Sequence, residues 1–405
     1  MKITKFIILF LSTLLIVFYI FINNSIGKPD SFLQELKLSL SKNTRETLKD
    51  TIFVFKRNKE LKKELSEIKE KKTSKLIKIF SNPLIYDHLN DYLKTKSILD
   101  LKDIRNLMIK DYILDKSQIS FNKIENLDWK FKGKKPKNRY EVFKVQYYDL
   151  KHFGILEKKN KLPSKNLFIY AQGHRGGTLY SDSNFLDIKE EFKNNDYDVL
   201  SLDMTGLGYN ENKIINFPNY KKNANPSIHG TYSTFLDKNF LNKKPLSLML
   251  SGNYFLIKKI IKQNNYKKIV MVGVSGGGWY TTLLSSLITE IDTSYSFSGT
   301  MPLFFMVFGK DMEDWELIDS SLYDKVDYNS LYILATLNRE YKVTRKHYQV
   351  YNSHDPCCLK DPAATLLKNI YNDLKVKNFE VVVIDSYIHS IDSKFLFESH
   401  FNYQK

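Results

Sequence analysis

One pentapeptide of the chain, Gly-Val-Ser-Gly-Gly at residues 273–277, has the residue types and spacing for nucleophilic chemistry. A short β-branched run precedes it at 268–272, and a run that can form a helix follows it at 279–287. Strand, G-x-S-x-G and helix together make the nucleophile-elbow pattern, in which small residues flank a serine on a tight, strained turn. The pattern predicts that Ser275 is a nucleophile whose hydroxyl stands above the edge of a sheet.

An ordinary glycine turn and a phosphate-binding loop are the alternatives to an elbow. Gly273, Gly276 and Gly278 have the spacing G-x-x-G-x-G, which differs from the dinucleotide-binding fingerprint. No acidic residue ends a second strand about twenty residues further on, as recognition of a ribose would require. Both observations favour the elbow.

A serine hydroxyl needs a base to take its proton and an acid to orient that base. His389 follows the last strong strand-like run, and Asp355 follows the strand-like run before it, so we expect His389 to be the base and Asp355 the acid. Asp355 stands before a proline, which also indicates a simple turn. Glu340 and Asp385 are competing acids, but Asp385 is only four residues from His389.

Donors for an oxyanion are expected after another buried strand, at 166–171. The segment 172–177 reads Gln-Gly-His-Arg-Gly-Gly, where a loop that binds an oxyanion would lie. The backbone N–H groups of Arg175 or Gly176, together with that of Gly276, are the predicted donors. A plain turn after a strand is the alternative.

The elements that must position these residues alternate between apolar strand-like runs and helical stretches. Such alternation predicts an α/β fold with a mostly parallel central sheet and helices on both faces. A helix is expected at 246–263, and the first two strands should be antiparallel. The expected strands are 140–147, 152–157, 166–171, 197–203, 268–272, 294–297, 348–351 and 379–384.

From about residue 140 onwards the chain resembles the α/β-hydrolase superfamily, in its esterase-like branch. The resemblance is carried by Met-Val-Gly-Val-Ser-Gly-Gly-Gly-Trp at 271–279, Tyr-Asn-Ser-His-Asp-Pro at 351–356 and His-Ser-Ile at 389–391. It implies the α/β-hydrolase fold, favours Asp355 as the third member of the triad, and implies a packing role for the cysteines. The loop reads His-Arg-Gly-Gly where the family has His-Gly-Gly-Gly. The chain therefore departs from the family's pattern in the loop that carries the predicted donors Arg175 and Gly176.

The N-terminal part lies outside this resemblance. Lys2 and Lys5 precede an apolar run from Phe6 to Ile22, which is long enough to span a bilayer and has no A-x-A-like cleavage site after it. We expect residues 1–27 to form a transmembrane signal anchor, with secretion after signal cleavage as the alternative. The positive-inside rule then places the catalytic domain outside the cytoplasm.

The rest of the chain divides into two expected regions. Residues 28–138 form a charged helical segment, and residues 139–405 form the α/β-hydrolase domain. The charged helices are expected to present a solvated face, with a stalk or a partner-binding segment as the alternative.

Composition limits the partners. The 405-residue chain carries a formal net charge of +17, which would suit nucleic acid. Its lysines are spread among many Asn and Ile residues, so a compositional bias explains the charge and nucleic acid is not expected. The two cysteines, Cys357 and Cys358, are adjacent in the sequence. They are expected to be either two free thiols or a vicinal disulfide. No metal-ligand spacing is present, and neither a metal nor a cofactor is expected.

Together these features predict a membrane-anchored serine hydrolase of carboxylesterase type that acts on a small-molecule or lipid-like acyl substrate. An acyltransferase of the cell envelope and a non-catalytic binding or scaffold domain are the alternatives, because a fold alone does not give a function. The sequence specifies neither the substrate nor the oligomeric state.

Overall fold

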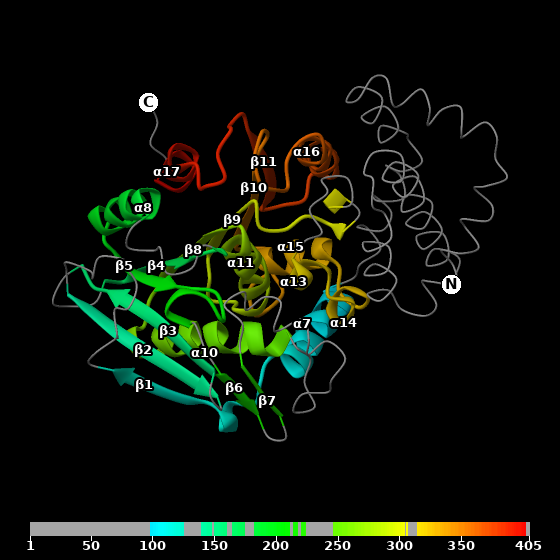
Figure 1. Cartoon of the computed structure of the whole chain (residues 1–405). Helices are drawn as coiled ribbons and strands as arrows, with labels where there is room; N and C mark the ends of the chain where they lie inside the picture. The colour runs from blue at the N-terminus through cyan, green and yellow to red at the C-terminus, as the bar shows by residue number, and fades with distance from the viewer. Residues whose placement is uncertain are drawn as a thin grey trace.

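The structure is a computed structural model of the chain, and Figure 1 shows its elements. It describes residues 98–124, 139–147, 150–159, 164–174, 182–210, 214–217, 220–223, 246–303, 305–306 and 314–401. The expected signal anchor, most of the charged segment, and the predicted donors Arg175 and Gly176 lie outside these residues. Among the described helices, none combines the length and the apolar character needed to cross a membrane.

A nine-stranded sheet forms the centre of the molecule, in the order β1-β2-β3-β5-β4-β8-β9-β10-β11. The pairs from β5 to β11 are parallel, whereas β1, β2 and β3 join the sheet in antiparallel orientation. The strands are β1 (Ser120–Ile124), β2 (Tyr140–Tyr147), β3 (Leu150–Glu157), β4 (Asn166–Ala171), β5 (Tyr197–Leu202), β8 (Lys268–Val274), β9 (Thr293–Phe297), β10 (Lys346–Asn352) and β11 (Phe379–Ile384). A separate antiparallel pair consists of β6 (Ile214–Phe217) and β7 (Tyr220–Asn223).

The predicted mostly parallel sheet is therefore confirmed, and the eight expected strands are all present. Three of them, β2, β4 and β11, have the predicted bounds, and the others differ by one or two residues at an end. The runs were readable because strands buried on both faces are almost continuously apolar. All six residues of β5, for example, are buried.

Helices cover both faces of the sheet, as predicted. On one face α8 and α17 pack against the strands through Phe185, Ile188, Phe192 and Leu396. On the other face a larger apolar cluster joins α7, α10, α11, α15 and α16 to the sheet. The helices are α7 (Ile98–Tyr112), α8 (Ser183–Asn194), α10 (Leu246–Asn264), α11 (Gly276–Leu287), α13 (Trp315–Ile318), α14 (Ser320–Tyr323), α15 (Tyr328–Thr336), α16 (Ala363–Leu374) and α17 (Ser393–Phe401), with short 3₁₀ turns at Lys116–Gln118 and Gly208–Asn210.

Residues 98–124, which the sequence assigned to the charged segment, belong to the same core as the sheet. Met108 and Tyr112 of α7 are fully buried in the larger apolar cluster. β1 pairs along its whole length with β2 and forms the edge of the sheet. Among the described residues, α7 and β1 have their partners in the later chain, so residues 98–124 share one core with the domain that follows the expected boundary at residue 138.

Candidate active site

Ser275 occupies the turn between β8 and α11. Its backbone has φ 57° and ψ −130°, a region that costs a residue with a side chain about 1–3 kcal/mol. Its N–H donates to the carbonyl of Phe297 on the neighbouring strand β9, at 2.9 Å, and its own carbonyl accepts from Trp279 in the first turn of α11. The strained backbone is therefore held from both sides, as expected for a nucleophile elbow.

The turn is tight because α11 begins in contact with β4. A Cβ added to Gly277 would lie 1.9 Å from the carbonyl oxygen of Ala171, and one added to Gly173 would lie 2.6 Å from the carbonyl oxygen of Val274. Only glycine permits these approaches of backbone to backbone. Gly276 is the first residue of α11, where N–H groups have no acceptor within the helix. Its N–H is thus suitably placed to bind an anion beside Ser275.

Asp355 follows β10 and is completely buried. Its carboxylate accepts hydrogen bonds from the backbone N–H of Cys357 (2.8 Å) and Cys358 (3.3 Å) and from the hydroxyl of Ser298 (2.9 Å). It also accepts from Nδ1 of His389, at 2.8 and 3.0 Å. Several donors on one buried carboxylate compensate for the loss of water around it.

The hydrogen bonds also fix the charge of this carboxyl. Burial raises the pKa of Asp355, but the hydrogen bond from His389, the N–H of Cys357, the charge of His389 and the hydroxyl of Ser298 lower it, and the net pKa lies below the usual value. The group is consequently an anion at neutral pH. Because a carboxylate only accepts, Nδ1 of His389 carries a proton and Nε2 has a lone pair in the neutral imidazole.

The sheet brings Ser275, Asp355 and His389 to one edge. They follow β8, β10 and β11, three parallel strands within four neighbouring positions of the sheet, so all three leave it at the carboxyl end. Asp355 and His389 are in contact. Among the described residues, no hydrogen bond joins Ser275 to His389; the hydroxyl of Ser275 lies 3.5 Å from Nδ1 of His174.

His174 belongs to a second pair of histidine and carboxylate. Its Nε2 lies 3.0 Å from Oε1 of Glu316, a completely buried residue of α13, and 3.6 Å from Oδ1 of Asp314. Burial lowers the pKa of His174, whereas the hydrogen bond and charge of Glu316 and the charge of Asp314 raise it, and the net shift is upward. His174 is therefore the imidazole beside the Ser275 hydroxyl, and it is more readily protonated than a free histidine.

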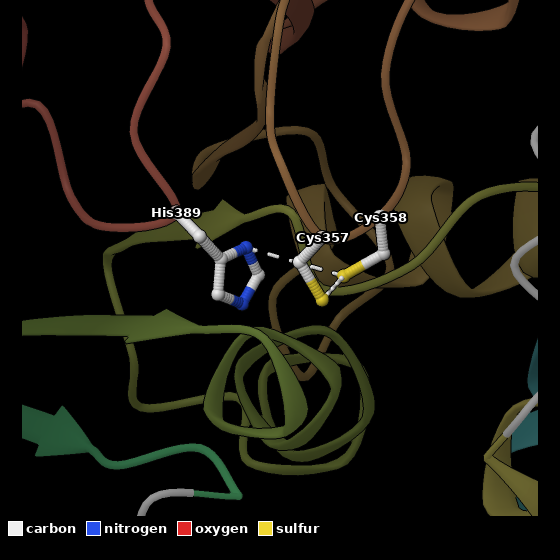
Figure 2. Close-up of side chains that lie close together, drawn as sticks. All are labelled: Cys357, Cys358 and His389. Atoms are coloured by element: carbon white, nitrogen blue, oxygen red, sulfur yellow. Dashed lines mark hydrogen bonds between the residues drawn. The ribbon is translucent and has the colours of Figure 1, made fainter.

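One pocket is lined by the elbow, by the His174 pair and by the loop that follows Asp355. Its lining includes Ser275, Gly276, His174, Glu316, Cys357 and Cys358. Figure 2 shows His389 and the two cysteines facing one another from separate loops, with Sγ of Cys358 4.0 Å from Nδ1 of His389. The pocket thus lies over the elbow, between the His174 pair and the loop that holds Asp355.

The competing acids do not approach His389. Glu340 lies in an exposed turn and pairs with Lys342. Asp385 is mostly exposed and pairs with His354, at 3.3 Å. Asp355 is the carboxylate that contacts His389.

Sequence reasoning missed three contributors to this site. The sequence pattern places His174 only in a loop of backbone donors, and neither Glu316 nor Ser298 belongs to a motif. One signal was available for His174, since a histidine directly after a buried strand would lie at the same sheet edge as the elbow. No local pattern indicates Glu316 or Ser298, because their roles arise from contacts across more than fifty residues of chain.

In the part of the chain that the structure describes, two groups of side chains could hold a metal ion, although the sequence shows no metal-ligand spacing. The ligand atoms of Cys357, Cys358 and His389 all lie within 4.8 Å of one another. The same is true of His174, Asp314 and Glu316. Both groups assemble from distant parts of the chain, so spacing along the sequence could not reveal them.

No protein-family model and no curated protein matches the chain. Similar solved structures include acetyl xylan esterase 1 from Thermoanaerobacterium sp. (13% identity, 74% of this chain and 91% of that chain covered, TM-score 0.47). An acetyl xylan esterase from Paenibacillus sp. R4 has 13% identity and a TM-score of 0.46, and the match covers 76% of this chain and 93% of that chain. An acylaminoacyl peptidase from Pyrococcus horikoshii has 16% identity and a TM-score of 0.44, and the match covers 67% of this chain and 43% of that chain.

At these identities and TM-scores the likenesses carry no argument about activity. The fold is read from the chain itself, from its parallel sheet covered on both faces, its strained serine between strand and helix, and the order of Ser275, Asp355 and His389 along the chain. In these respects the chain resembles the α/β-hydrolase superfamily.

Proposed function

We propose that the protein is a serine hydrolase of carboxylesterase type. Ser275 attacks an acyl carbonyl, His389 takes the proton of the hydroxyl, and Asp355 orients the imidazole and stabilises its charged form. Water then releases the acyl group from the enzyme. The observation that supports this proposal is the buried, multiply hydrogen-bonded Asp355 on Nδ1 of His389, at the sheet edge from which the strained Ser275 projects.

The assignment of His389 as the base follows from its tautomer. With Nδ1–H donated to Asp355, the lone pair of Nε2 is available to accept the serine proton. Hydrogen bonds between nucleophile and base are often long without substrate and tighten only in the complex. The N–H of Gly276 is the first proposed oxyanion donor, and Arg175 or Gly176 supplies the second.

His174 is the competing candidate for the base, because it is the imidazole within 3.5 Å of the Ser275 hydroxyl. Glu316 and Asp314 raise its pKa despite burial, so a larger fraction of His174 than of a free histidine is protonated near neutral pH, and a protonated ring has no lone pair to accept the serine proton. We therefore assign His174 to the pocket wall beside the nucleophile rather than to proton abstraction.

Labelling by a fluorophosphonate probe tests the nucleophile. The full chain should react with the probe and hydrolyse short aryl esters, whereas the Ser275→Ala variant should do neither. His389→Gln should slow hydrolysis by about 10²–10⁴-fold, the usual contribution of a general base.

The matched variant His174→Gln separates the two imidazoles. It should slow hydrolysis far less than His389→Gln. If His174→Gln slowed hydrolysis more than His389→Gln, His174 would be the base instead. If the wild-type chain stayed unlabelled by the fluorophosphonate probe while a control esterase was labelled, the proposed function would be wrong.

A further inference from the structure

The loop that holds Asp355 carries two thiols that the proposed hydrolysis does not use. Cys357 is exposed and Cys358 is partly buried, and no disulfide joins them. Their sulfur atoms lie 2.8 Å apart, and Sγ of Cys358 lies 4.0 Å from Nδ1 of His389 (Figure 2). The imidazole nitrogen that binds Asp355 therefore also faces two potential thiolates.

We propose that Cys357, Cys358 and His389 form a binding site for a thiophilic divalent cation of the zinc class, and that occupancy of this site switches the hydrolase off. Two thiolates and one imidazole are a ligand set that zinc accepts, with a fourth position open to water. Soft thiolate ligands exclude calcium and magnesium, which take oxygen ligands. The inhibitory part of the proposal rests on the proposed function, whereas the binding part does not.

The spacing of the three atoms needs only local adjustment. Bonds of about 2.3 Å to sulfur and 2.0–2.1 Å to nitrogen place tetrahedral ligands roughly 3.6–3.8 Å apart. The distance from Sγ of Cys358 to Nδ1 of His389 is 4.0 Å, close to this value. The two sulfur atoms, at 2.8 Å, must separate by roughly 1 Å, and the exposed side chain of Cys357 has room to rotate.

A disulfide between the same cysteines is the less favourable use of the pair. Consecutive Cα atoms across a trans peptide lie about 3.8 Å apart, below the usual range of about 4.4–6.8 Å for disulfides. Ring closure would also twist the peptide whose N–H, from Cys358, donates to Asp355. The reduced pair keeps this donor in place and leaves both sulfur atoms available to a cation.

Metal binding and the hydrogen bond between His389 and Asp355 exclude each other. The cation would bind the lone pair of Nδ1, and the proton now on Nδ1 would move to Nε2, because a neutral imidazole holds one proton. Nε2 could then no longer accept the proton of Ser275. Each thiol would also lose its proton to solvent, so that one cation replaces two thiol protons and leaves the oxidation states unchanged.

Binding is tested with cadmium, whose bond to a thiolate has a charge-transfer absorption in the ultraviolet. Because Cys357 and Cys358 are the only cysteines of the chain, this absorption reports on them alone. The reduced full chain and its Ser275→Ala variant should both titrate to one cadmium per chain. The double variant Cys357→Ser/Cys358→Ser should show no signal. His389→Gln should weaken cadmium binding by at least about tenfold, because even the loss of a residue that only supports a metal ligand typically costs about 10–100-fold in affinity.

The cadmium titration decides the site even if the chain hydrolyses no ester, since the Ser275→Ala protein is equally informative. Titration to one cadmium per two chains, or unchanged affinity in the His389→Gln variant, would overturn the proposed ligand set. A chain that binds cadmium as described without hydrolysing esters would leave the site in place and remove the proposed function together with the switch.

Inhibition is tested with zinc on ester hydrolysis, each variant being compared with its own metal-free rate. Zinc should inhibit the wild type reversibly, and a chelator should restore the rate, while magnesium and calcium should have no effect. In Cys358→Ser, half-inhibition should require at least about tenfold more zinc.

The second group of possible ligands supplies the matched control. Glu316→Gln removes a carboxylate from the group of His174, Asp314 and Glu316 and should leave zinc inhibition unchanged. Inhibition that persists in Cys358→Ser and disappears in Glu316→Gln would assign the metal to that other group and overturn the proposal.

Discussion

At the scale of single residues, the site contains the serine of the elbow and two imidazoles in different environments. His389 donates to a buried aspartate that is an anion at neutral pH. His174 is hydrogen-bonded to the buried Glu316, and its pKa is raised in spite of burial. A base must be neutral to work, so the environments suit the two rings to different tasks.

The His174 pair should stabilise the fold more in mild acid than in alkali. A histidine whose folded pKa lies above its unfolded value of about 6.5 contributes fully below that value and loses this contribution as pH rises through the folded pKa. A double-mutant cycle of His174→Gln and Glu316→Gln, followed by urea unfolding, should therefore give a larger coupling free energy at about pH 5.5 than at about pH 9. A coupling that is equal or greater at the higher pH would show that His174 is not charged in the fold.

At the scale of elements, the elbow depends on how closely α11 approaches β4. Alanine normally stabilises a helix relative to glycine by about 0.5–1 kcal/mol. At Gly277 the added methyl would meet the backbone of Ala171, which cannot move aside as a side chain can. The steric cost should reverse the usual preference.

Gly277→Ala should therefore lower the free energy of unfolding by more than about 3 kcal/mol, the upper part of the range for overpacking. Gly154→Ala is the matched control, because its methyl would meet the flexible side chain of Leu256. It should cost less, about 1–3 kcal/mol. Thermal unfolding of both variants measures the difference, and a Gly277→Ala protein as stable as the wild type would mean that α11 can shift away from the strand.

The elements that the sequence predicted well are those with strong local patterns. β4 and β11 are mostly apolar runs, and the elbow has its own spacing of glycines. These patterns predict a parallel sheet and place Ser275, Asp355 and His389 each after one of its strands. Because parallel strands end at the same edge, the sequence is enough to predict that the three residues share one edge.

Other elements depend on partners far away in the chain. α13, which supplies Glu316, is only four residues long and has no periodic pattern to read. α7 has a charged sequence with a weak apolar face, and its place in the core follows from contacts with helices formed much later. These contacts are tertiary, and local propensity does not encode them.

At the scale of the whole molecule, α7 joins the beginning of the described chain to its centre. Arg105 on α7 donates to the carbonyls of Ser286 (2.9 Å), Leu334 (2.9 Å) and Leu337 (3.1 Å), at the ends of α11 and α15. The last carbonyls of a helix lack partners within it, and a cation there is favourable. Arg345 donates to Leu334, Leu337 and Ser285 from the other side. Two buried arginines thus cap the nucleophile helix and its neighbour.

Arg105→Met should destabilise the protein by about 2–4 kcal/mol, more than a single hydrogen bond of a charged group, because several carbonyls lose a donor together. Lys102→Met on the exposed side of the same helix is the control and should change stability by less than about 0.5 kcal/mol. Urea unfolding of the two variants compares them. Equal stability of both would mean that Arg345 alone suffices to cap the two helices.

The hydrogen bonds from Arg105 to distant carbonyls can form only late in synthesis, after their acceptors have been made. Its acceptors lie between 181 and 233 residues further along the chain. A ribosome that adds about 5–20 residues per second needs roughly 10–50 s to make that stretch. Among the described helices, α7 packs against α10, α11 and α15, which are all synthesised after it. The nascent chain must therefore keep Met108 and Tyr112 from aggregating until these helices have emerged.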